Sequence, residues 1–134
     1  MVVVAHWIVA VWHLFLTAPI LPTPNNHVSW PGIFFITVGH LCIAIMVWRL
    51  RDRLAGVVLL LFFLAVLAAD LYEHFLHAAP NNVFMVAAGV RTFWFDASVV
   101  GLLELEILAR ALGILLLSGW PTPRAANIAA EKSR

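Results

Sequence analysis

The chain alternates between long apolar stretches and short breaks that contain proline, asparagine or arginine. An α-helix needs about 20 mainly apolar residues to cross a bilayer, and four stretches approach or exceed that length. The pattern therefore predicts an all-α protein, an integral membrane four-helix bundle. The predicted spans cover residues 2–21, 32–48, 54–77 and 97–118.

The stretch from Val83 to Ser118 contains no proline and is too long for one span. A single helix of that length would measure about 54 Å, whereas the hydrocarbon core is about 30 Å thick. We therefore divide it into an interfacial helix over residues 83–95 and the last span. A polar tail follows over residues 121–134.

Composition supports a membrane location for this single domain of 134 residues. The chain is 63% hydrophobic and 11% charged, with a mean hydropathy of +0.98. Soluble domains are about 45–50% apolar and about 25% charged, so lipid is expected to cover part of this surface. The net charge of +1, without a basic run, argues against a nucleic-acid partner. Cys42 is the only cysteine, which excludes an intrachain disulfide and Cys-x-x-Cys chemistry.

The basic residues predict the orientation. Six of the eight Lys and Arg residues fall in the loop after the second span or in the tail. The positive-inside rule then places both of these segments, and both termini, in the cytoplasm. We expect a multi-pass protein of a bacterial inner membrane. The stretch from Asp70 to His77 would lie in the outer leaflet.

That stretch holds the candidate metal ligands. Asp70, His74 and His77 are spaced at i, i+4 and i+7, which places their side chains on one face of a helix. Imidazole and carboxylate ligands suit zinc, iron or copper better than calcium. The sequence therefore predicts a polar outer-leaflet pocket that binds a metal ion or a small polar ligand. The chain would act alone, as a homo-oligomer or as an accessory subunit of a larger membrane complex.

Three further interpretations use residues at membrane depth. His13 and His40 lie near the middle of the first two spans, at matching depth, as two axial ligands of haem b would. Asp70 and Glu104 are candidate general acid and base groups for an enzyme acting on a lipid-like or isoprenoid substrate. The same groups are candidates for a proton-coupled transporter. Glu106 is spaced i, i+4 from Arg110 and is expected to form a structural ion pair with it.

Overall fold

The computed structural model describes residues 1–18, 30–50, 52–78, 82–86 and 93–118. These residues form four α-helices and one π-helical turn, which confirms the all-α prediction for this part of the chain. The end of the first predicted span at residues 19–21, the middle of the predicted interfacial helix at residues 87–92 and the polar tail at residues 121–134 lie outside the described residues. The elements are α1 (Val2–Thr17), α2 (Trp30–Arg49), α3 (Asp52–Leu71), η1 (Tyr72–Leu76) and α4 (Phe93–Leu117).

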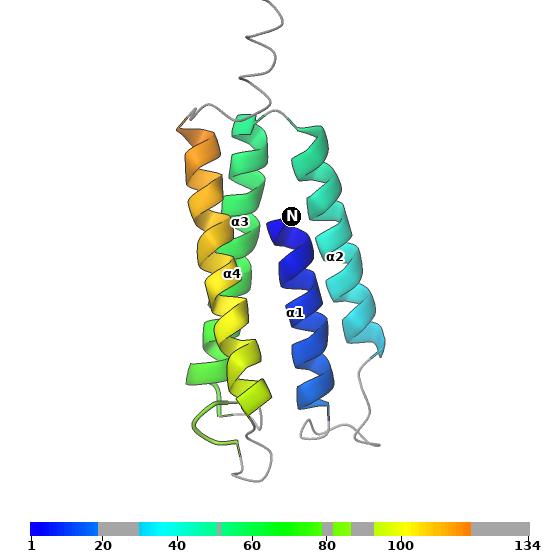
Figure 1. Ribbon diagram of the computed structural model, residues 1–134, viewed down its shortest axis with the longest axis vertical. Helices are drawn as coiled ribbons and strands as arrows, with labels where there is room; N and C mark the ends of the chain where they lie inside the picture. Colours follow the sequence, from blue (N-terminus) through cyan, green and yellow to red (C-terminus); the bar gives the residue numbers. More distant parts are fainter. Residues whose placement is uncertain (19–29, 51, 79–81, 87–92, 119–134) are drawn as a thin grey trace, which may run out of the picture.

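The four helices lie side by side, and successive helices run in opposite directions (Figure 1). The most extensive contact joins α3 to α4, while α1 contacts α2 and α4, and α2 contacts α3. The helix α1 begins part-way along its neighbours (Figure 1). Leu59 and Phe63 of α3 form a fully buried core with Val3 of α1 and Ala109 of α4. This core lies beside the polar residues described below.

The helix boundaries differ from the predicted spans by a few residues. The helix α2 extends two residues earlier than expected, and α4 begins at Phe93 instead of residue 97. The prediction of an interfacial helix over residues 83–95 is therefore wrong for the residues at each end of that range that the structure describes. Residues 93–95 already belong to α4, and residues 83–86 form a turn and a bend.

The side chain of Asn82 explains why this segment turns. Its amide donates to the carbonyl of His77 at 2.8 Å, and its side-chain oxygen accepts from the backbone N–H of Phe84 at 2.9 Å. Its own carbonyl accepts from the N–H groups of Met85 and Val86. Asparagine side chains commonly stabilise turns in this way.

Two helical segments are long and apolar enough to cross a membrane, namely Trp30–Arg49 and Arg53–Leu76. The helix α1 is apolar but shorter. The helix α4 is long enough, but it carries Glu104, Glu106 and Arg110 within its length. Length and apolar composition thus support two of the four predicted spans among the described residues.

Candidate metal centre

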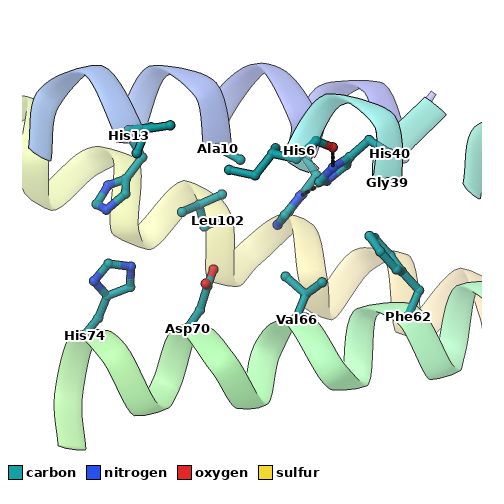
Figure 2. A pocket seen from close by; sticks show the side chains of 12 residues that line it. His6, Ala10, His13, Gly39, His40, Phe62, Val66, Asp70, His74 and Leu102 are labelled. Atoms are coloured by element: carbon teal, nitrogen blue, oxygen red, sulfur yellow. Dashed lines mark hydrogen bonds between the residues drawn. The ribbon is translucent and has the colours of Figure 1, made fainter. Parts of the chain in front are cut away.

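A cavity of about 400 Å³ lies between the helices, and all four α-helices contribute to its lining. Most of the lining is apolar, but five of its side chains carry imidazole or carboxylate groups (Figure 2). These five are His6, His13, His40, Asp70 and His74.

A chain of hydrogen bonds at one end of the cavity fixes the tautomers of two histidines. His40 Nδ1 lies 2.7 Å from the carbonyl oxygen of Ile36. A carbonyl oxygen only accepts, so Nδ1 of His40 carries a proton, and Nε2 of the neutral ring is an acceptor. His6 Nδ1 lies 2.8 Å from that nitrogen, and the two rings are inclined by only 14°. His6 therefore donates from Nδ1, which leaves the lone pair of its Nε2 facing the centre of the protein.

The free side of His6 faces carboxylates from two other helices. His6 Nε2 lies 3.3 Å from Glu106 Oε1 on α4. His6, Asp70 and Glu106 each offer one ligand atom, and these three atoms all lie within 4.8 Å of one another. His6 is 1% exposed and Glu106 is fully buried. We call this group of three residues the His6 site; its donor atoms are close enough to hold a metal ion.

The second carboxylate oxygen of the buried glutamate strengthens this interpretation. Glu106 Oε2 has no hydrogen-bond partner among the described residues. Leaving a buried polar atom without a partner costs about 1–3 kcal/mol, and more for a charged group. The arrangement needs a proton or a metal ion between the carboxylates and the His6 nitrogen.

A second pair of histidines lies at the other end of the cavity. The rings of His13 and His74 are 4.7 Å apart between centroids, with their planes at 82°. Figure 2 shows Asp70 between this pair and the pair of His6 and His40, with its carboxyl group directed into the cavity. His13 is 7% exposed and His74 is 4% exposed.

The structure brings together most, but not all, of the predicted site residues. His13, His40, Asp70 and His74 line one cavity. Glu104, the predicted acid or base, is exposed on α4, and His77 is exposed beyond the end of η1. The predicted ion pair of Glu106 is replaced by its contact with His6, while Arg110 donates from Nε to the backbone carbonyl of Glu106.

The π-helical turn η1 explains why His77 leaves the cavity. The N–H of His77 donates to the carbonyl of Tyr72, which is a bond across five residues and is wider than an α-helical turn. The backbone of His77 is extended, with φ −78° and ψ 131°, so the helix has already ended. Its ring stacks on Tyr72 at 5.2 Å and its Nδ1 lies 3.5 Å from an exposed Glu73 oxygen.

The haem interpretation requires a free nitrogen on each axial histidine. Both ring nitrogens of His40 have partners within the protein, namely the Ile36 carbonyl and His6. His40 therefore orients His6 instead of offering a nitrogen to an iron atom in this conformation. The arrangement favours His6, not His40, as a ligand.

His6 and Glu106 were absent from the predicted site, although the sequence contains a signal for each. His6 and His13 are seven residues apart, which is two helical turns and places them on one face. Ser98, Ala109 and Gly113 are small residues separated by 11 and 4 positions, which is about three turns and one turn, so they lie on one face of α4. That face includes residue 106 but not residue 104. Buried positions on α4 follow this face.

The chain matches no protein-family model, and comparison with curated proteins and with solved structures finds no similar chain. The chemistry of the cavity is therefore argued from its own residues. Carboxylates and imidazoles in a buried site can hold a transition-metal ion or transfer protons.

Proposed function

We propose that this chain is an integral membrane protein that holds a divalent transition-metal ion, of the zinc, iron or copper class, at the His6 site. The observation that carries the proposal is the lone pair of His6 Nε2 facing two carboxylates, one of them fully buried. His40 supplies the partner that histidine ligands of metals usually have, because it accepts the other ring proton of His6. Carboxylate and imidazole ligands suit these metals.

A metal ion accounts for the charge as well as for the geometry. Among the described residues, no Lys or Arg lies within ion-pair distance of Asp70 or Glu106, and the charge of Arg110 acts on Glu106 only from farther away. Burying a carboxylate without a neighbouring cation costs on the order of several kcal/mol of folding free energy. A divalent cation would neutralise both carboxylates and accept the lone pair of His6.

The membrane part of the proposal depends on the outer surface. Large apolar side chains are exposed on all four helices, including Phe15 on α1, Leu41 on α2, Leu61 on α3 and Ile107 on α4. So many large exposed apolar side chains are unusual on a soluble monomer of this size. The buried ionisable groups meanwhile face one another inside, as they do in membrane proteins. Lipid is therefore the proposed environment of the outer surface.

The test measures the metal content of the protein purified in detergent. Wild type, His6→Asn, Glu106→Gln and the control Glu104→Gln are dialysed against Zn²⁺ and analysed by mass spectrometry for bound metal. Asparagine can still donate from its amide to His40, but it lacks the nitrogen that faces the carboxylates. We expect wild type and Glu104→Gln to hold the same amount of zinc, and the other two variants to hold at least one ion fewer per chain. Equal content in all four proteins would refute the His6 site.

A second candidate function is a proton pathway, which the hydrogen-bonded chain from the Ile36 carbonyl through His40 and His6 to Glu106 favours. Chains of acid and histidine side chains transfer protons in many membrane proteins. Proton flux in sealed vesicles distinguishes the two candidates. A pathway predicts flux in metal-free protein that is lost in Glu106→Gln, whereas a metal site predicts no such flux.

A further inference from the structure

The end of the cavity away from His6 has its own unpaired donor atom. His13 Nδ1 lies 2.8 Å from Ser98 Oγ, and Ser98 Oγ lies 2.7 Å from the carbonyl oxygen of Phe95. The serine hydroxyl has one proton, which it donates to that carbonyl, so toward His13 the hydroxyl oxygen accepts. His13 Nδ1 is therefore protonated.

It follows that the lone pair of the neutral His13 ring is on Nε2. This atom is buried and has no hydrogen-bond partner among the described residues. In the described part of the chain, His13 and Glu106 are the two side chains with a buried nitrogen or oxygen atom that has no hydrogen-bond partner. Both lie beside the histidines and Asp70 of the cavity. An imidazole held by a hydrogen bond at one nitrogen, with the other nitrogen free, is the usual state of a histidine that binds a metal.

Two more donor groups line the same end of the cavity as His13, although their ligand atoms and His13 Nε2 are not all within 4.8 Å of one another, as those of the His6 site are. The ring of His74 is 4.7 Å from that of His13 between centroids. Asp70 is one helical turn before His74, and both side chains line the cavity. His6 and His13 are two turns apart on α1, about 10 Å along the helix axis, which leaves room for two separate positions.

We infer that His13, His74 and Asp70 form a second position for a divalent transition-metal ion, which we call the His13 site. This inference rests on the proposed function, because Asp70 belongs to both sites. The cavity would then hold two ions along its length, one at each pair of histidines. The His13 site has more imidazole and less carboxylate than the His6 site, so it suits zinc or copper better than a harder ion.

The experiment compares zinc stoichiometry in wild type, His13→Asn and the control His77→Ala. Asparagine can still donate to Ser98 but has no atom in the place of Nε2, so the helix contact is kept while the ligand is removed. The control removes an exposed histidine three residues after His74. We expect two zinc ions per chain in wild type and His77→Ala, and one in His13→Asn.

A second variant tests the hydrogen bond that fixes His13. Ser98→Ala leaves every proposed ligand in place but removes the acceptor for the Nδ1 proton. Losing such a partner weakens metal binding by about 10- to 100-fold. The dissociation constant of the second zinc ion, measured by titration, should rise by this factor, and that of the first should not change.

The outcomes separate the two proposals. One ion in wild type, unchanged in His13→Asn and lost in His6→Asn, would overturn the His13 site and leave the His6 site standing. No bound ion in wild type would overturn both. Two ions with one lost in each of His6→Asn and His13→Asn would support both sites.

Discussion

His6 and His40 show how two adjacent histidines can have different roles. His6 presents its free nitrogen to the carboxylates, while His40 uses both nitrogens within the protein. His40 is therefore a positioning residue, which holds His6 in one tautomer and one orientation. This division of roles depends on the carbonyl of Ile36, because that oxygen can only accept.

Substitution of His40 is expected to weaken the His6 site without removing a ligand. His40→Leu leaves the Nδ1 proton of His6 without an acceptor, and loss of such a partner reduces metal affinity by about 10- to 100-fold. His40→Gln offers a carbonyl oxygen near the place of Nε2 and should restore part of the affinity. Competition with a chelator for Zn²⁺ measures both constants. Equal affinity in His40→Leu and wild type would show that His40 does not position His6.

The sequence indicated four of the side chains that line the cavity, whereas Glu104, the glutamate that it selected, is exposed on α4. Glu104 and Glu106 are two residues apart on one helix, so only one of them can face the interior. Hydrophobicity does not distinguish them, because both have long apolar neighbours. The distinction comes from small residues on the buried face, and from the contact with α1, which the sequence alone does not reveal.

At the level of elements, the close approach of α3 and α4 depends on two glycines. A Cβ atom added at Gly56 would lie 2.7 Å from the backbone oxygen of Gly113. One added at Gly113 would lie 3.0 Å from the backbone oxygen of Gly56. Backbone atoms cannot move aside as a flexible side chain can, so either substitution must separate the two helices. Glu106, two turns before Gly113, would then shift relative to Asp70.

Gly56→Ala should therefore destabilise the protein by about 1–3 kcal/mol, the usual range for overpacking. Gly39→Ala is the matched control, since a Cβ there meets nothing within 4 Å. In a helix, alanine is favoured over glycine by about 1 kcal/mol, so the control should be neutral or stabilising. Unfolding in detergent mixtures, followed by circular dichroism, gives both values. A Gly56→Ala protein as stable as Gly39→Ala would contradict the observed helix contact.

The positions of the four helices were predictable from the sequence to within a few residues, whereas the turn η1 was not. Asp70 and His74 share a face in either type of helix at this spacing, and both reach the cavity. His77 depends on how the helix ends, because the wider turn and the extended backbone at His77 move it out to the surface. The pattern of apolar and polar residues does not predict this wider turn, because the sequence from Tyr72 to Leu76 is typical of an α-helix.

For the whole molecule, the proposed ligands connect elements that are distant in sequence. His6 is on α1, Asp70 is on α3 and Glu106 is on α4, so an ion at the His6 site joins three helices. His13 on α1 and His74 on η1 make a second connection across the cavity. Without an ion, both carboxylates depend on protons for neutralisation. A metal ion bound at either proposed site would therefore link helices and stabilise the fold.

Removing the metal should consequently lower the stability of the whole protein. A ligand that binds only the folded state stabilises it by about 2.7 kcal/mol at a free concentration 100 times its Kd. Thermal unfolding in detergent should therefore occur at a lower temperature in excess chelator than in buffered Zn²⁺. Glu104→Gln should show the same difference as wild type, because Glu104 is exposed. The double variant His6→Asn/His13→Asn should unfold at one temperature in both buffers, since one imidazole ligand is removed from each site. A difference that persists in the double variant would mean that zinc stabilises the protein elsewhere, and that neither site accounts for the effect.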